Sequence, residues 1–325
     1  MVARIFWFLL ILSCGFFVPF FLFLPETCRN IVGDGSFPPP WSSANLTDHF
    51  RFKKRAKQGK VVNEQKLAEL RKNYKIVIPN PISTLRILAD FEAAMLLVGG
   101  GLAVACFYAI STGVSTVFSS GYGFDELHVS LMFLPVGGGS LVSTFTTGKL
   151  VDWNYRRHAK KLGFPVQKNR QTDLSDFPIE RARVELTLPI LLIGAAAVIG
   201  YGWMMDHHIS LAGPIVMLFI LGYTIIGGYQ CLNVLMVDLF PKQAAAATAA
   251  SNVVRCLLGA AASAAITPMS DAIGNGWAYT ILALLFVSCT LGPAASMKYG
   301  IKWRKAKKEK SEVRKRKHEE AAKRT

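Results

Sequence analysis

The sequence is poor in charged side chains. Asp, Glu, Lys and Arg make up 18% of its 325 residues, whereas soluble domains usually carry about 25%. The deficit is uneven, because apolar runs of about twenty residues alternate with dense polar blocks. This alternation predicts an all-α polytopic membrane protein and excludes a soluble multidomain chain.

Motifs for catalysis and metal binding are also absent. The six histidines form no HExxH pattern, and no nucleophile motif or phosphate-binding loop is present. The six cysteines are scattered, without CxxC or zinc-site spacing, so thiols packed within helices are the simplest interpretation. We therefore expect no enzyme activity, no catalytic residue, no metal site and no cofactor.

Seven apolar segments are each long enough to cross a bilayer with some tilt. The first could be mistaken for a signal peptide, but it ends in Pro25-Glu26 rather than at a small-residue cleavage site, so it is predicted to be a span. The predicted spans are Ile5–Leu24, Ala93–Phe118, His128–Gly148, Leu186–Met205, Leu211–Val234, Ala244–Thr267 and Trp277–Met297.

Lys and Arg residues are confined to one set of loops. Twelve lie in 29–86, nine in 149–183 and thirteen in 298–324, whereas the alternate loops 119–127, 206–210 and 268–276 have none. Because basic loops stay in the cytoplasm, the C-terminus is predicted to be cytoplasmic and the N-terminus to lie on the far side. The net charge of +16 therefore reflects topology, and we expect no nucleic-acid partner.

The polar blocks divide the chain into four predicted parts. They are a single span at 1–26, a cytoplasmic linker at 27–92, a six-helix unit at 93–297 and a basic tail at 298–325. Within the linker, KQGKVVNEQKLAELRKNYK is predicted to form a surface helix, and ISTLRILADF a short interfacial amphipathic helix. The Asn45-Leu46-Thr47 sequon falls on the cytoplasmic side and is predicted to be unmodified.

Arg255 lies near the middle of the sixth predicted span. It is about 20 Å along a helix counted from Lys242, in a bilayer core about 30 Å thick. A guanidinium there costs at least about 2.5 to 3.5 kcal/mol unless it meets a partner or a wet cavity. Ser251, Arg255, Gly259 and Ser263 share one helix face, which must therefore point into protein or water. Helix–helix locking and direct contact with a substrate or proton path remain equal alternatives.

Other polar groups within the spans are candidates for lining a transport path or for interhelical hydrogen bonds. No acidic residue lies clearly at mid-membrane. Glycine clusters and prolines indicate helices that pack tightly yet bend, as transporters need, although a static bundle is an alternative. The path candidates are Tyr108, Tyr229, Gln230, Asn233, Asn252 and Arg255, and Ser111, Thr112 and Tyr223 are further polar groups in the spans.

Three stretches resemble a known family. Gly148 to Arg157, GKLVDWNYRR, is similar to the loop signature of the major facilitator superfamily. Phe23 to Ser36 resembles the end of the sixth helix in fungal twelve-span drug:proton antiporters of the quinidine-resistance type, and Asp238 to Arg255 resembles their tenth-to-eleventh helix junction. The chain is thereby identified as a member of this superfamily.

The resemblance implies a fold and a function. The seven spans would be the sixth to twelfth helices, the last six forming a C-terminal half of two inverted three-helix repeats. The implied activity is proton-coupled multidrug-type efflux of small organic compounds at the plasma membrane, by alternating access and driven by a proton gradient. The residues implied for a cytoplasmic gate are Gly148, Asp152, Arg156 and Arg157, and those for the first-span motif are Pro25, Glu26, Thr27 and Arg29.

Several alternatives remain open. Asp152 could accept from helix-terminal N–H groups or pair with Arg156 to hold the gate closed, or it could belong to an ordinary charged loop. The resemblance leaves the first five family helices without a counterpart, so the chain is predicted to be truncated and to need an N-terminal half as a partner. An inactive membrane remnant is the main alternative, and a seven-helix receptor is a remote one.

Overall fold

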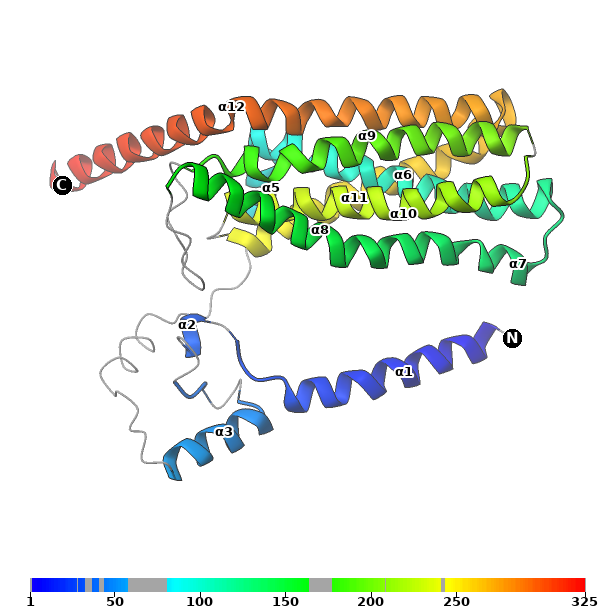
Figure 1. The fold of residues 1–325 in the computed structure, drawn as a ribbon. Helices are drawn as coiled ribbons and strands as arrows, with labels where there is room; N and C mark the ends of the chain where they lie inside the picture. Colours follow the sequence, from blue (N-terminus) through cyan, green and yellow to red (C-terminus); the bar gives the residue numbers. More distant parts are fainter. Residues whose placement is uncertain are drawn as a thin grey trace. The chain divides into compact units, whose positions relative to one another are not determined.

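The computed structural model describes residues 2–27, 29–32, 37–40, 44–57, 81–163, 177–207, 209–240 and 243–324. The chain divides into two units, Met1–Pro79 and Asn80–Thr325, which are described separately. All regular structure in the described residues is helical, and seven of the helices are long and apolar enough to span a membrane. The prediction of seven spans is therefore confirmed by length and composition (Figure 1).

The second unit is a bundle of six long helices preceded by the short α5 (Pro81–Leu88). Its long helices run side by side along most of their length (Figure 1). The bundle comprises α6 (Phe91–Gly121), α8 (Phe133–Lys161) entered through the short α7 (Glu126–Leu131), α9 (Ile179–Asp206), α10 (Ala212–Leu239), α11 (Ala244–Ile273) and α12 (Asn275–Arg324).

The helix contacts follow a pseudo-two-fold pattern. The pairing of α6 with α11 is matched by that of α10 with α8, and the pairing of α6 with α12 by that of α10 with α9. The pair α9 and α12 maps onto itself. The first set of three helices is α6, α8 and α9, and the second is α10, α11 and α12. Because each set crosses the bundle three times, an odd number, the two sets run in opposite directions. This arrangement fits two inverted three-helix repeats, as the resemblance implies.

The helices extend beyond the predicted spans. The stretch Gly148–Arg157, predicted as a loop signature, is helical, because α8 continues to Lys161. In the same way α9 begins at Ile179, and α12 continues through the predicted tail to Arg324. Hydropathy identifies only the apolar part of each helix, whereas the helical backbone hydrogen bonds continue into the charged residues beyond it. The amphipathic helix is confirmed as α5, and Asp90 after it accepts from the Ala93 N–H at 3.2 Å to cap α6.

Glycines bring α8 and α10 into backbone contact. A Cβ added at Gly139 would lie 2.1 Å from the Phe219 carbonyl oxygen, and one at Gly222 would lie 2.2 Å from the Val136 carbonyl oxygen. On α9 the close approaches are at Gly194 and Gly202, whereas Ala196, four residues before Gly200 and so on its helix face, is exposed. The glycines predicted to allow tight packing do so. Periodicity alone did not identify which residues on α9 make the contact.

The first unit contains α1 (Val2–Phe23), α2 (Arg29–Val32) and α3 (Leu46–Lys57). The start of α3 is bonded to the end of α1. The Asn45 side chain donates to the Leu24 carbonyl, and Thr47 donates to the Phe23 carbonyl at 2.6 Å. Terminal carbonyls of α1 are thus satisfied by the sequon residues. The predicted surface helix in the linker lies almost wholly outside the described residues, and the absence of a glycan on Asn45 remains a prediction.

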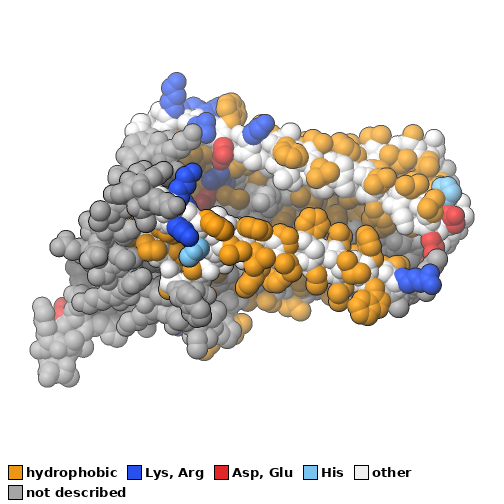
Figure 2. All heavy atoms as spheres, turned by 90° about the horizontal axis from the view of Figure 1, so that it is seen from below, with side chains coloured by type: hydrophobic (Ala, Val, Ile, Leu, Met, Phe, Trp, Pro, Cys, Tyr) orange, Lys and Arg blue, Asp and Glu red, His pale blue; other side chains and the backbone are white. Residues whose placement is uncertain are grey.

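Charged side chains gather toward one end of the bundle, called here the basic end. Figure 2 shows hydrophobic side chains along the helices, with most Lys and Arg side chains on that face toward one end. In the bundle this end carries Lys160, Lys161, Arg183, Lys298 and Lys302. Apolar helix surfaces with charge at one end suit a bilayer-spanning bundle.

Candidate functional site

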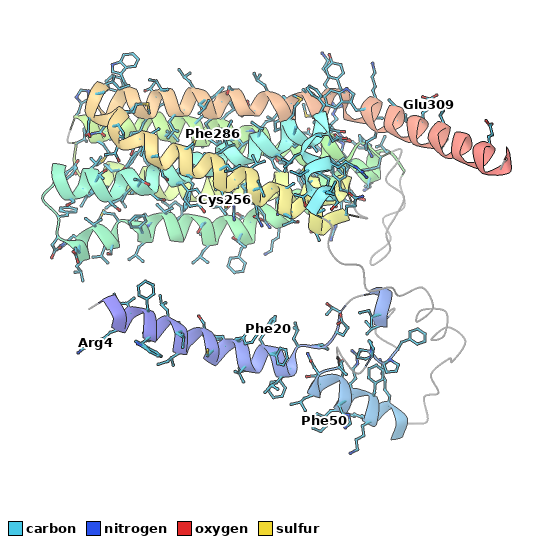
Figure 3. All side chains as sticks on the ribbon, turned by 180° about the vertical axis from the view of Figure 1, so that it is seen from behind. Arg4, Phe20, Phe50, Cys256, Phe286 and Glu309 are labelled. Carbon is cyan, nitrogen blue, oxygen red and sulfur yellow. The ribbon has the colours of Figure 1, made fainter. Side chains whose placement is uncertain are left out.

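Arg255 lies on the face of α11 that points into the bundle. Ser251 and Gly259, one turn before and after it, are buried, as the shared helix face predicted. Arg255 itself is half-buried, and its Nε is buried without a hydrogen-bond partner among the described residues. No carboxylate of the described residues pairs with it. Cys256, the next residue along, is exposed, and Figure 3 labels it on α11.

Tyr229 of α10 provides the contact that Arg255 does make. The guanidinium carbon lies 5.9 Å from the Tyr229 ring centroid. The Tyr229 hydroxyl is in turn 3.5 Å from the Ser251 hydroxyl. A desolvated cation–π contact contributes about 2 kcal/mol, less than the roughly 2.5 to 3.5 kcal/mol cost of an arginine at membrane depth. The three residues, called the Arg255 cluster, therefore retain an unneutralised cation.

Two further path candidates lie next to this cluster on α10. Asn233 is four residues after Tyr229 and so shares its face, and the Asn233 Oδ1 is buried without a partner among the described residues. Gln230 is exposed, as is Asn252 of α11. Among the described residues, neither amide makes a hydrogen bond with Arg255. The polar groups instead extend from Arg255 onto the exposed surface.

Tyr108 of α6 closes the other side of Gly259. A Cβ at Gly259 would lie 2.5 Å from the Tyr108 Cδ2, so the ring occupies the space that the glycine leaves. Tyr108 is 38% exposed, and among the described residues it makes no hydrogen bond with the Arg255 cluster. Its neighbours Ser111 and Thr112 donate to carbonyls of their own helix, at 2.8 and 3.0 Å. Their hydroxyl protons are therefore already engaged in hydrogen bonds within α6.

Tyr223 of α10 has a structural partner that the sequence did not indicate. Thr146 of α8 donates to the Tyr223 hydroxyl at 3.2 Å. Thr146 also lies 2.8 Å from the Val142 carbonyl. The tyrosine therefore links two helices of opposite repeats rather than presenting a free hydroxyl.

A second polar group, called here the Arg183 cluster, lies at the basic end of the bundle. Arg183 of α9 pairs with Asp238 of α10, its Nη2 at 3.2 Å, and with Asp152 of α8, its Nη1 at 3.7 Å. The guanidinium also lies over the Tyr155 ring at 5.3 Å. One arginine thus joins three helices drawn from both repeats.

The sequence predicted only part of this cluster. Pairing with Arg156 was one of the alternatives left open for Asp152, but Arg156 is exposed and Asp152 pairs with Arg183 instead. Arg157 lies over the Trp153 ring at 5.7 Å, and Gly148 is exposed with open space around it. The importance of Arg183 was missed because it was assigned to a loop. The signal was available in the apolar residues Ile179, Ala182 and Leu186, whose i, i+3, i+7 spacing is that of one helix face.

The first-span motif residues lie in the other unit. The Glu26 N–H donates to the buried Asp48 at 3.1 Å. Pro25 is half-buried, Thr27 is exposed, and Arg29 begins α2. These residues therefore act locally, by fixing how α3 follows α1.

Comparison with known proteins now decides the family. A sequence profile of the Major Facilitator Superfamily matches residues 3–264. The chain belongs to the major facilitator superfamily. This membership rules out the seven-helix receptor. Members are transporters, so a non-enzymatic role is the expected one for this chain as well.

Fungal transporters of this superfamily are the similar curated proteins. The chain is 48% identical to MFS-type transporter phiD of Fungal sp. (strain ATCC 74256), over 96% of this chain and 47% of that protein. It is 44% identical to MFS-type transporter tstD of Talaromyces stipitatus, over 98% and 58%. It is 28% identical to Citrate exporter 1 of Aspergillus niger, over 93% and 57%. The chain thus spans about half to three-fifths of the length of these relatives.

The Arg183 cluster leads to a mutational prediction. In a transporter completed by an upstream half, Asp152→Asn should lower efflux up to about fivefold without lowering expression, because an exposed ion pair contributes at most about 1 kcal/mol. Efflux from cells that lack their own pumps measures the effect, with immunoblotting for expression. Arg156→Gln is the matched control, since Arg156 is exposed and makes no ion pair with any described residue. Unchanged efflux in Asp152→Asn would exclude a gating role for Asp152.

Proposed function

We propose that this chain supplies the C-terminal half of a proton-coupled exporter of small organic compounds that works by alternating access. Family membership and the pseudo-two-fold bundle support this proposal. The greater length of its relatives supports a second half as the partner, with the substrate bound between the halves. The proposed location is the plasma membrane, with the basic end in the cytoplasm.

The observation that carries the substrate class is the Arg255 cluster. Arg255 keeps a positive charge inside the bundle, with Tyr229 beneath it and no carboxylate partner among the described residues. A planar guanidinium with free donors binds carboxylates in a bidentate manner. One relative is named as a citrate exporter. We infer that the exported compounds carry a carboxylate, which Arg255 binds.

The Arg183 cluster fits the proposed gate. Asp152, Arg183 and Asp238 connect α8, α9 and α10 at the basic end, so a rocking motion that separates these helices has to break the ion pairs. The pair with Asp238 is the stronger one, because the Asp238 side chain is 25% exposed and that of Asp152 is 68% exposed. The cluster would then favour the state that is closed on the basic side.

An efflux assay with a matched set of compounds tests this function. The full chain is expressed together with the upstream half of a relative in cells that lack their own exporters. We expect efflux of labelled di- and tricarboxylates at least about tenfold faster than that of their neutral amides, and we expect a protonophore to stop it. Efflux of amides and acids at equal rates would overturn the carboxylate assignment. Absence of any efflux, with both parts present at the membrane, would favour the inactive remnant.

A further inference from the structure

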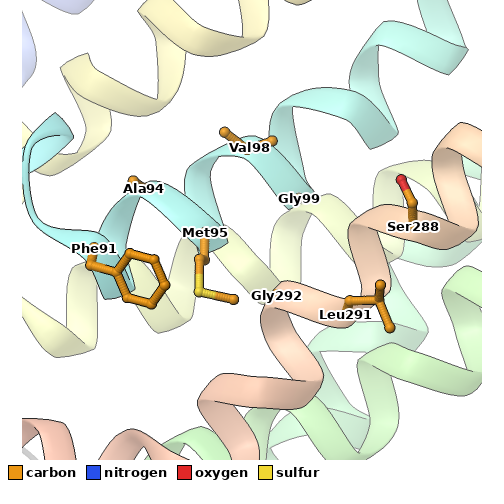
Figure 4. A pocket seen from close by; sticks show the side chains of 8 residues that line it. All are labelled: Phe91, Ala94, Met95, Val98, Gly99, Ser288, Leu291 and Gly292. Atoms are coloured by element: carbon orange, nitrogen blue, oxygen red, sulfur yellow. The ribbon is translucent and has the colours of Figure 1, made fainter.

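A groove opens between α6 and α12, away from both polar clusters. Its volume is about 360 Å³, and its walls are Phe91, Met95 and Val98 of α6 and Ser288, Leu291 and Gly292 of α12, with smaller residues between them (Figure 4). The helices come closest at Gly292, where an added Cβ would lie 2.8 Å from the Met95 carbonyl oxygen. The floor of the groove is therefore backbone, and its walls are side chains.

The lining of the groove is apolar and accessible. Phe91 is 69% exposed and Leu291 is 68% exposed. Ser288 is the one polar residue of the lining, and its hydroxyl donates to the Leu285 carbonyl at 2.6 Å. The groove thus offers hydrocarbon surface and no unsatisfied donor, which suits an alkyl chain.

The groove leads to a mouth of aromatic and basic side chains at the basic end. Lys298 and Lys302 follow Leu291 by seven and eleven residues, so all three lie on one face of α12. Trp303 stands edge-on to Phe91, with ring centroids 5.9 Å apart, and Tyr299 lies 6.0 Å from Trp303. Tyrosine and tryptophan favour the level of the lipid headgroups.

We propose that this groove binds one anionic phospholipid, with an acyl chain between α6 and α12 and the phosphate at Lys298 and Lys302. The two ammonium groups belong to residues about 10 and 16 Å along the helix from Leu291, which is the direction from hydrocarbon to headgroup. This site is independent of the exported substrate and of the gate. The bound lipid would hold α12 against α6 on the surface of the bundle.

The charges around the mouth favour an anion over a zwitterion. Both lysines are exposed, and Lys298 lies 5.4 Å from the Tyr299 ring centroid. Of the nearby acids, Asp90 is engaged as the cap of α6, and Glu92 is 3% exposed and accepts from Ser296 at 3.5 Å. A phosphate with net negative charge therefore meets two cations and no exposed carboxylate of α6. Each lysine near a membrane surface contributes about a fivefold gain in affinity.

Native mass spectrometry of the full chain in detergent tests the proposal. The protein is titrated with phosphatidylserine and with phosphatidylcholine of the same acyl chains. We expect one phosphatidylserine to bind more tightly than phosphatidylcholine, and the double variant Lys298→Gln/Lys302→Gln to weaken that binding at least about tenfold. As a control, Lys160→Gln/Lys161→Gln removes two exposed charges of α8, also at the basic end of the bundle. This variant should leave phosphatidylserine binding unchanged.

Two further measurements separate the parts of the site. Ala94→Phe places a ring in the groove and should lower occupancy while the protein still elutes as a single folded species. Millimolar glycerophosphate, which carries the phosphate without acyl chains, should not compete. Equal loss in both lysine double variants, full lipid binding by Ala94→Phe, or competition by glycerophosphate would overturn the proposal.

Discussion

Replacing Arg255 with leucine should abolish efflux by a completed transporter while leaving the bundle folded. The charge is needed only when a substrate or partner is bound, because no described carboxylate neutralises it. In the isolated chain the same change removes a cost of about 2.5 to 3.5 kcal/mol and a cation–π contact of about 2 kcal/mol. We therefore expect the chain alone to become more stable by about 1 kcal/mol. Carboxylate efflux and thermal unfolding in detergent measure the two effects.

The neighbouring positions supply controls for this prediction. Arg255→Lys keeps the charge but loses the bidentate fork, and should retain weak efflux with a raised KM. Cys256→Ala changes an exposed residue beside it and should leave both efflux and stability unchanged. Equal loss of folded protein on Arg255→Leu, in the isolated chain and in the completed transporter, would instead assign Arg255 to packing.

Gly139→Ala should destabilise the bundle by about 3 kcal/mol, at the upper end of the usual cost of overpacking. Its Cβ would meet the Phe219 carbonyl oxygen at 2.1 Å and the Tyr223 nitrogen at 2.9 Å. These are backbone atoms of α10, so no side-chain rotation relieves the collision and the helices have to separate. Gly222→Ala meets the reciprocal contact on α8 and should behave alike. Thermal unfolding of the full chain should show melting temperatures lower by several degrees.

Gly137→Ala is the matched control in the same glycine cluster. It has no atom within 4 Å of the added Cβ, and alanine favours a helix over glycine by about 0.5 to 1 kcal/mol. We therefore expect Gly137→Ala to be neutral or slightly stabilising. Similar melting temperatures for the two alanine variants would show that α8 and α10 do not pack backbone to backbone.

The number of membrane-spanning helices among the described residues could be predicted from sequence, because a bilayer imposes length and apolarity on each span. Their ends could not, because helix continues into charged sequence once the backbone ladder is formed. The loop signature Gly148–Arg157 shows this, since α8 includes all of it. The inward face of α11 also followed from sequence, because a charge among small residues every fourth position has one tolerable orientation.

The sequence by itself determined that this chain crosses a membrane as helices and that the helix face of Arg255 points into protein or water. Only the tertiary structure decided which groups meet. It joined Arg183 of α9 to acids of α8 and α10, and it placed Tyr229, not an amide, beneath Arg255. The physical reason is that hydropathy and periodicity act within one helix. Contacts between helices depend on how each helix is rotated about its axis and shifted along it. Close backbone approaches at glycines, such as that of Gly139 to Phe219, fix both.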